Sequence, residues 1–252
     1  MTYVLDINRG SLKTHHFLCQ MNISNSIKIF SAPRKNWADF SAGIVVECIL
    51  ACIKESGHCD VMLTGGNSAA LLYAAWARHP NFRKVAPVSY YFGDERCVPH
   101  LHADSNFGLA MRTLFSSGVP DGCSIHRMHA DSVDLDRAAG HYAMRLPDCI
   151  DVLLLGVGED GHIASLYPHS AALYDIRRVV PIKGPNLPSQ RLTITPTVIQ
   201  GARYTFVLAT GPTKSAVLEK VLSLPHDVDA FPVRMVQNSI WLMDEKTILG
   251  DL

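Results

Sequence analysis

An acid and a histidine stand two positions apart in the segment GVGEDGHIASLYP, which covers residues 156–168. Histidine is the side chain that most readily moves protons near neutral pH, and a nearby carboxylate can fix its tautomer and raise its basicity. Asp160 and His162 supply such a pair among three glycines, directly after an apolar run. An isolated histidine is more often structural, but this placement makes His162 a candidate general base.

Three charged side chains follow another apolar run, in the segment GDERCVP at residues 93–99. A turn with a purely structural role rarely needs so many charges. The planar fork of donors on Arg96 suits a phosphate or a developing oxyanion, and Asp94 or Glu95 could hold that guanidinium in place. A structural ion pair without a catalytic duty is the alternative, and the residue types alone leave it open.

A glycine pair, Gly65 and Gly66, lies between a short apolar run and a predicted helix. The backbone N–H groups of such a turn can approach a ligand closely, and Asn67 and Ser68 can cap the helix and face an anion at its positive end. The segment has the spacing of neither a Walker loop nor a dinucleotide fingerprint. Phosphate binding and ordinary helix capping are therefore both open.

Apolar runs alternate with amphipathic segments along the chain, which predicts how these loops are positioned. We expect strands at residues 59–63, 88–92, 150–155, 191–195, 204–209 and 240–243, and helices at residues 37–56, 69–76, 106–115 and 213–222. This order indicates an α/β fold with a mostly parallel central sheet and helices on both faces. Ligands bind outside the carboxyl ends of the strands in such sheets, so the three loops are predicted to converge.

Length and composition indicate a single-domain protein and argue against a nucleic-acid-binding, secreted or membrane protein. The 252 residues suit one domain spanning 1–252, with residues 1–27 as an extension of uncertain role. Lys plus Arg and Asp plus Glu each total 23, and no basic stripe predicts a nucleic-acid partner. The amino terminus lacks the apolar core of a signal peptide, and the most apolar window, residues 43–53, is far shorter than the roughly 20 residues that span a bilayer. We expect a cytoplasmic protein without membrane partners.

Two groups of residues have metal-binding side chains, but their spacing argues against a metal. The 7 cysteines are scattered without a C-x-x-C pair, which predicts free thiols in a reducing compartment. Cys48 and Cys52 are one helical turn apart, and we interpret them as small core residues. His100, His102 and Asp104 match no established zinc pattern. We therefore expect no metal and no cofactor.

Three blocks of sequence, LTGGNSAALLY, YYFGDERCVPHLHADSNFGLA and DVLLLGVGEDGHIASLYP, together resemble the 6-phosphogluconolactonase family in order and spacing. The resemblance runs from about Val61 to Lys214. It departs in the first block, where the family usually has Ser-Thr-Pro and this chain has residues 67–69, Asn-Ser-Ala. Related sugar-phosphate deaminases share a Gly-x-Asp-Gly-His core but usually continue Ala-Phe-Asn-Glu-Pro. This chain continues Ala-Ser-Leu-Tyr-Pro after Ile163, like the lactonases, although Ile163 itself is typical of the deaminases.

The resemblance implies a modified Rossmann-like, sugar-phosphate isomerase-like fold and a cofactor-free carboxylic ester hydrolase. Its reaction would be the hydrolysis of 6-phospho-D-glucono-1,5-lactone to 6-phosphogluconate in the oxidative pentose phosphate pathway, by a monomer or small homo-oligomer. His162 would activate water and Asp160 would orient it. The residues expected to bind the substrate and its phosphate are Gly65, Gly66, Asn67, Ser68, Asp94, Arg96, Arg191 and Lys214.

Two other functions fit the same residues. The nearer is an aminosugar-phosphate deaminase or isomerase, from which the residues after His162 distinguish this chain. The other is a sugar-phosphate sensor that binds without turnover, and the presence of both Asp160 and His162 argues against it.

Overall fold

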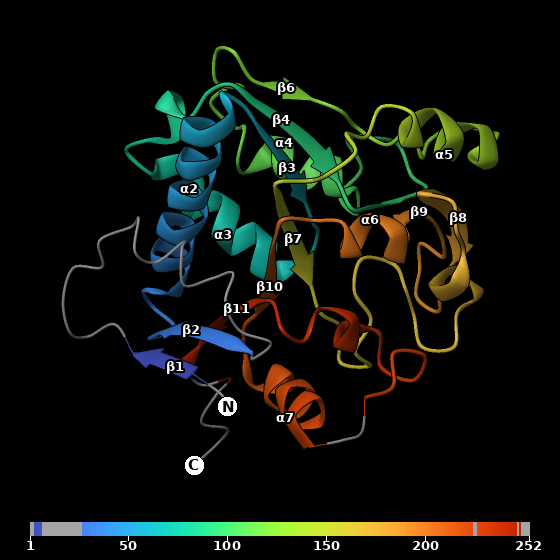
Figure 1. The fold of residues 1–252 in the computed structure, drawn as a ribbon. Helices are drawn as coiled ribbons and strands as arrows, with labels where there is room; N and C mark the ends of the chain where they lie inside the picture. The colour runs from blue at the N-terminus through green and yellow to red at the C-terminus, as the bar shows by residue number, and fades with distance from the viewer. Residues whose placement is uncertain (1–2, 7–26, 224–225, 246, 248–252) are drawn as a thin grey trace.

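Strands and helices alternate along most of the chain (Figure 1). The computed structural model describes residues 3–6, 27–223, 226–245 and 247. The strands are β1 (Tyr3–Asp6), β2 (Lys28–Ala32), β3 (Cys59–Leu63), β4 (Val88–Phe92), β5 (Asp94–Arg96), β6 (Ser124–Ile125), β7 (Val152–Gly156), β8 (Val179–Lys183), β9 (Gln190–Ile194), β10 (Tyr204–Ala209) and β11 (Ile240–Asp244). The α-helices are α2 (Trp37–Ser56), α3 (Asn67–Arg78), α4 (Asn106–Arg112), α5 (Leu135–Ala143), α6 (Pro196–Gln200) and α7 (Ser215–Ser223). Short 3-10 helices cover Phe82–Lys84, Ala171–Tyr174, Pro212–Lys214 and Pro232–Val236.

The central sheet has eight strands in the order β1-β2-β11-β10-β7-β3-β4-β6. Every pair of neighbouring strands in it is parallel. Strands β10, β7, β3 and β4 are therefore adjacent, and their carboxyl ends lie along one edge. The loops that follow β3, β4 and β7 carry the predicted site residues, so the topology brings them together as the sequence predicted.

Helices cover both faces of this sheet, which explains why its central strands are apolar throughout rather than alternating. Val61 and Leu154 pack on the face covered by α2, α3 and α4, whereas Met62 and Leu155 pack on the opposite face with α5, α6 and α7. In Figure 1, α2 and α3 lie on one side of the sheet, and α5 and α6 lie on the other. The prediction of a mostly parallel sheet with helices on both faces is confirmed.

A second, smaller sheet was not predicted. Strands β5, β9 and β8 form it in that order, and both of its strand pairs are antiparallel. The predicted strand at residues 191–195 is present as β9, but it belongs to this small sheet rather than to the central one. Its pairing with β5 places Arg191 directly opposite Arg96.

Several boundaries agree closely with the prediction. The strands at residues 88–92 and 204–209 have the predicted limits, and α2 ends where Gly57 donates its N–H to the carbonyl of Ile53. Cys48 and Cys52 lie buried on α2, as predicted for core residues. Most of the amino-terminal extension, including Cys19, falls outside the described residues, and the assignment of residues 1–27 and of one domain over 1–252 stays a prediction. None of the described helices has both the length and the apolar character of a membrane span.

Candidate active site

A pocket of about 350 Å³ opens at the carboxyl ends of β3, β4, β7 and β10. Most of the predicted site residues line it, although they come from five separate segments of the chain. The predicted residues in its wall are Gly65, Gly66, Asn67, Ser68, Asp94, Arg96, His162, Arg191 and Lys214. Asp160 is the exception, because it lies behind His162 and reaches the pocket through that side chain.

His162 and Asp160 form a closely bonded pair. The Nδ1 atom of His162 lies 2.6 Å from Oδ1 of Asp160, and the backbone N–H of His162 donates to the same oxygen at 3.1 Å. Burial works against ionisation of Asp160, but the hydrogen bonds and charge of His162 keep the pKa of this carboxyl below its ordinary value. Asp160 is therefore an ionised acceptor at neutral pH. With Nδ1 engaged, Nε2 is the ring nitrogen of His162 that is left for other chemistry.

The loop around the pair requires glycine at two positions. A Cβ atom on Gly158 would lie 2.0 Å from Nδ1 of His162, so a side chain there would occupy the space of the imidazole. Gly161 has a φ of +83°, and its backbone packs on the ring of Phe231. The carbonyl of Gly161 also accepts the N–H of Val233 at 2.8 Å. The histidine is thus held from its own loop and from a segment about seventy residues further along the chain.

Tyr167 packs on the other side of the imidazole. The centroids of the two rings are 4.7 Å apart, and the guanidinium of Arg191 lies 5.9 Å from the Tyr167 centroid. Burial raises the pKa of the Tyr167 phenol, so its ring is neutral at physiological pH. The Tyr167 ring therefore contacts both the imidazole of His162 and the guanidinium of Arg191.

Asp94 does not bind a cation, despite its place beside Arg96 in the sequence. One carboxylate oxygen accepts from Asn106 Nδ2 at 3.0 Å, and the other accepts from Ser165 Oγ at 2.6 Å. Asp94 is only 4% exposed. It therefore ties the loop after β4 to α4 and to the loop that carries His162.

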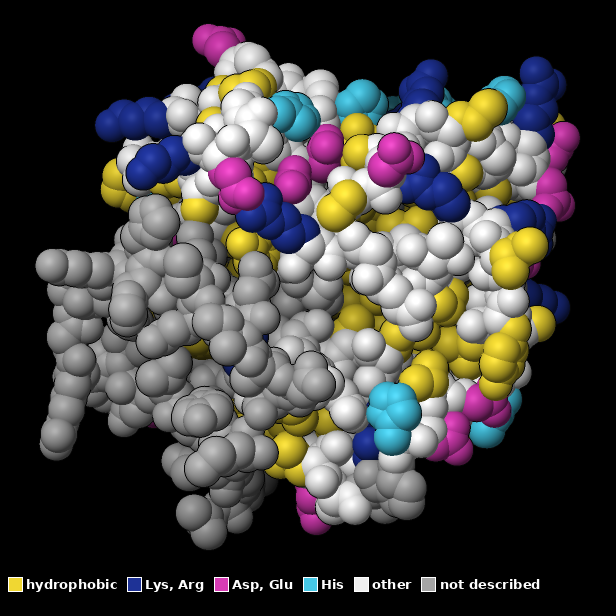
Figure 2. All heavy atoms as spheres, in the orientation of Figure 1, with side chains coloured by type: hydrophobic (Ala, Val, Ile, Leu, Met, Phe, Trp, Pro, Cys, Tyr) yellow, Lys and Arg dark blue, Asp and Glu magenta, His cyan; other side chains and the backbone are white. Residues whose placement is uncertain are grey.

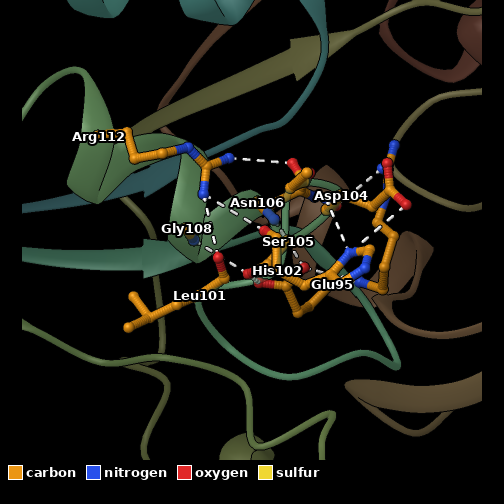
Figure 3. Close-up of polar contacts among 10 residues, drawn as sticks. Glu95, Leu101, His102, Asp104, Ser105, Asn106, Gly108 and Arg112 are labelled. Carbon is orange, nitrogen blue, oxygen red and sulfur yellow. Dashed lines mark hydrogen bonds and ion pairs between the residues drawn. The ribbon is translucent and has the colours of Figure 1, made fainter.

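Glu95 anchors the start of α4, as Figure 3 shows. Its Oε1 accepts the backbone N–H groups of Arg96 and Asn106, and its Oε2 accepts the hydroxyl of Ser105 and the N–H of Phe107, all within 3.0 Å. Burial raises the pKa of Glu95, and the backbone N–H donors oppose that shift. The prediction that Asp94 or Glu95 holds the guanidinium of Arg96 is wrong, because both carboxylates are used by α4 and its neighbours. The Nη1 atom of Arg96 donates instead to the backbone carbonyl of Asp104 at 3.0 Å.

Arg96 and Arg191 bring two cations together at the pocket wall. They are directly opposite in the β5–β9 pair, and like charges in that relation are destabilising. Among the described residues, neither Nε atom has a hydrogen-bond partner, although both are buried. An unsatisfied buried donor costs about 1–3 kcal/mol. An anion in the pocket would relieve both costs.

The amino terminus of α3 also faces the pocket. The helix begins at Asn67 after Gly66, and no side chain caps it. The predicted capping by Asn67 and Ser68 is therefore wrong, because the hydroxyl of Ser68 lies 2.7 Å from Thr210 Oγ1 instead. This leaves the N–H groups of the first turn available to an anion.

Lys214 also lines the pocket, at the end of the 3-10 helix that leads into α7. Partial burial lowers the pKa of its ammonium, and the carboxylates of Glu159 and Asp160 oppose that shift. Backbone near Lys214 is fixed by Asp244, which accepts the N–H of Gly211 at 3.1 Å. The loop after β10 thus contributes to the pocket through Lys214, which was one of the predicted binding residues.

The lining residues that the sequence did not assign to the site include the polar side chains of Asn106, Thr210 and Thr64. Asn106 had a detectable signal, since a helix was predicted to begin there. In the structure Ser105 caps α4 by accepting the N–H of Gly108. Thr210 and Thr64 carried no sequence signal that would assign them to a site, because a threonine after a strand is common in any α/β fold.

The histidines near the second loop do not form a cluster with one another. His100 lies 3.5 Å from Asp131, and His102 lies 3.6 Å from Asp104. Within the described residues, no group of three or more His, Cys, Asp or Glu side chains has the arrangement of a metal site.

Comparisons with known proteins agree with the geometry. The profile of the family described as glucosamine-6-phosphate isomerases/6-phosphogluconolactonase matches residues 33–246. The 6-phosphogluconolactonase of Pseudomonas putida is 33% identical over 226 residues, covering 86% of this chain and 92% of that protein. The crystal structure of 6-phosphogluconolactonase from Thermotoga maritima superposes with a TM-score of 0.75 at 23% identity, covering 86% of this chain and 99% of that one. A monomeric glucosamine-6-phosphate deaminase has the same fold, with a TM-score of 0.74 at 16% identity and coverage of 88% and 98%.

Proposed function

Because the chain belongs to the glucosamine-6-phosphate isomerase/6-phosphogluconolactonase family, we propose that it hydrolyses 6-phospho-D-glucono-1,5-lactone to 6-phosphogluconate in the oxidative pentose phosphate pathway. The observation that carries the proposal is the His162–Asp160 pair at the wall of a pocket that also presents cations and an uncapped helix terminus. A lactonase needs a base for water, a stabilised oxyanion and a hold on the distant phosphate. The pocket offers a candidate for each.

In the proposed reaction, His162 is the general base. Its Nδ1–H donates to the ionised Asp160, which leaves the lone pair of Nε2 to accept a proton from water. The water oxygen bonds to the lactone carbonyl carbon, and the carbonyl oxygen takes up the negative charge. When the ring C–O bond breaks, the imidazolium returns the proton to the leaving oxygen, and the product carboxylic acid then loses a proton to solvent. Asp160 stabilises the imidazolium during this cycle.

The negative groups of the substrate are assigned to the cationic wall. We place the phosphate against residues 65–68 at the start of α3, with Lys214 as a further cation of the pocket lining. Arg96 and Arg191 supply guanidinium donors whose Nε atoms have no partner among the described residues. Their fixed forks suit both phosphate oxygens and a developing oxyanion.

The competing reaction within the family is deamination or isomerisation of an aminosugar phosphate. The segment after His162 favours the lactonase, because Ser165 and Tyr167 stand where the deaminases usually have other residues. Both side chains contact residues that line this pocket, Ser165 through Asp94 and Tyr167 through His162. Deamination of an aminosugar phosphate therefore serves as the alternative activity to be measured alongside lactone hydrolysis.

A pH-controlled assay tests the proposal, with the lactone generated in situ because it hydrolyses spontaneously. We expect the protein to accelerate the reaction far above the uncatalysed background, and the folded His162→Ala variant to lose that acceleration. A folded wild-type protein that does not exceed the background would refute the lactonase assignment. Release of ammonia from glucosamine 6-phosphate would then identify the deaminase, and binding without turnover would identify a sensor.

A further inference from the structure

A second hollow, of about 470 Å³, lies between residues 127–134 and helix α5. No residue lines both this hollow and the active-site pocket. In Figure 2, Lys, Arg and His side chains lie at the upper right of the molecule together with several Asp and Glu side chains, where Figure 1 places α5. The mechanism proposed above uses none of the residues in this hollow.

One wall of the hollow is an extended segment in which side chains alternate. Met128 and Ala130 are buried in the core at 1% and 2% exposure. Arg127, His129 and Asp131 alternate with them in sequence and line the hollow. The two-residue period of an extended chain therefore directs these three side chains to the same side.

The other wall is helix α5 and the turn that follows it. Arg137, His141 and Arg145 are spaced four residues apart and all line the hollow, which is the spacing of one helix face. Tyr142 forms part of the floor, and its buried hydroxyl is held by the backbone N–H and carbonyl of Phe92, at 2.7 and 3.1 Å. The floor is therefore rigid, and the cationic side chains stand around it.

The two acidic residues of the hollow have hydrogen-bond partners within the protein. Asp131 binds Arg127 at 3.0 Å, and Asp134 caps α5 by accepting the backbone N–H of Arg137 at 2.9 Å. Among the described residues, no carboxylate forms an ion pair with the side chain of Arg137 or Arg145. The hollow therefore presents two guanidinium groups that have no ion-pair partner among the described residues, and its lining of three Arg and two Asp side chains carries a formal charge of +1 (3 − 2).

We propose that this hollow binds a small organic phosphate with two or more negative charges, of the nucleoside triphosphate type. Arg137 and Arg145 contact the phosphate oxygens, because guanidinium forks match phosphate geometry. Val133, Ala138 and the ring of Tyr142 supply an apolar surface for the organic part of the ligand. The volume of the hollow falls within the roughly 300–1,000 Å³ of small-molecule sites.

His129 provides an independent reporter of such a ligand. Burial lowers the pKa of its imidazole, and the nearby cations Arg127 and Arg145 lower it further, while Asp131 opposes them and His100 adds a small unfavourable interaction. A bound polyanion reverses the field of these cations. Binding should therefore raise the pKa of His129 and be accompanied by proton uptake near neutral pH.

Calorimetric titration of the full chain with ATP, inorganic triphosphate and adenosine tests the proposal. We expect saturable binding of ATP, weaker binding of triphosphate and none of adenosine. The double variant Arg137→Gln/Arg145→Gln should weaken ATP binding by at least about tenfold. The matched control Arg78→Gln/Arg83→Gln removes the same charge from another surface and should change the affinity for ATP by less than about twofold. An Arg191→Gln variant, altered in the active-site pocket, should bind ATP like the wild type.

The outcomes separate the two sites. Absence of ATP binding at millimolar concentration, or equal binding by the Arg137/Arg145 variant and its control, would overturn the proposal. Binding lost in the Arg191 variant but kept in the double variant would place the ligand in the active-site pocket and overturn it as well. The double variant should keep the circular dichroism spectrum of the wild type, which shows that the protein is folded and keeps this test independent of the proposed reaction. An NMR titration of His129 with and without ATP supplies the second readout.

Discussion

Replacing Asp160 with asparagine removes one charge and leaves the shape of the side chain almost unchanged. The carboxylate accepts the Nδ1–H of His162 at 2.6 Å, so the variant exchanges a charged hydrogen bond for a neutral one. Hydrogen bonds to charged groups contribute about 1.5–3 kcal/mol. Because the side chain of Asp160 is 45% exposed, water screens part of this interaction, and the lower end of that range applies. We therefore expect kcat/KM to fall about 10- to 30-fold, at about 1.4 kcal/mol per factor of ten.

The pH profile distinguishes a positioning role from general damage to the pocket. The pKa of Asp160 is held below its ordinary value, so its carboxylate stays charged as the pH falls through the range in which an imidazole gains its proton. The acid limb of kcat/KM in the wild type therefore reports His162. A neutral amide stabilises the imidazolium less, so this limb should move to lower pH in Asp160→Asn while the maximum rate falls.

A double variant tests whether Asp160 acts through His162. The kcat/KM of each variant is measured by a stopped assay and corrected for the uncatalysed rate of hydrolysis. General-base catalysis contributes about 10²–10⁴-fold, so His162→Ala should lose that much. Asp160 acts through His162, and the variant Asp160→Asn/His162→Ala should be no slower than His162→Ala alone. Wild-type kcat/KM with an unshifted acid limb in Asp160→Asn, or additive losses in the double variant, would refute the reasoning.

Three further predictions test the groups around this pair. Gly158→Ala should reduce kcat by about 10² or more in a protein with native circular dichroism, because its Cβ would lie 2.0 Å from Nδ1 of His162 and must displace the ring; a rate near wild type would contradict it. Glu95→Gln faces buried N–H donors with a donor of its own and should lower stability by about 2–3 kcal/mol, seen as a fall of about 4–12 °C in Tm, whereas an unchanged Tm would show that Glu95 is not the anchor of α4. Lys214→Met should raise KM for the phosphorylated lactone more than for unphosphorylated gluconolactone, and equal effects on the two would rule out a phosphate contact.

The central sheet could be predicted because its strands carry a strong local signal. Residues 88–92 and 204–209 are almost wholly apolar, as strands buried on both faces must be, and their limits were predicted correctly. The convergence of the loops followed from topology alone, since parallel strands place their carboxyl ends at one edge. Nine of the ten predicted site residues then lie in the wall of one pocket, and the tenth, Asp160, bonds to His162 behind it.

The second sheet could not be predicted, because no local pattern specifies it. Strand β5 consists of Asp94, Glu95 and Arg96, three charged residues that are depleted in strands. They are extended because β9 pairs with them, and β9 lies nearly a hundred residues further along the chain. The predicted capping by Ser68 failed for the same reason, since its hydroxyl contacts Thr210, which is 142 residues away in sequence. Contacts between residues far apart in the chain therefore determine both the strand conformation of β5 and the partner of Ser68. Local sequence patterns do not reveal such contacts.

Features that are unfavourable without a ligand are concentrated at the active-site pocket. Arg96 and Arg191 face each other across a strand pair, their Nε atoms are buried without a partner among the described residues, and α3 begins without a side-chain cap. Each costs stability by itself, and natural sequences normally avoid such conflicts outside functional sites. All three features call for the same kind of ligand, because each leaves positive charge or N–H donors without a partner. A dianionic phosphate ester would offset all three together, whereas the oxygens of a neutral sugar can accept from the N–H donors but leave the repulsion between Arg96 and Arg191, so the pocket itself suits an anionic ligand.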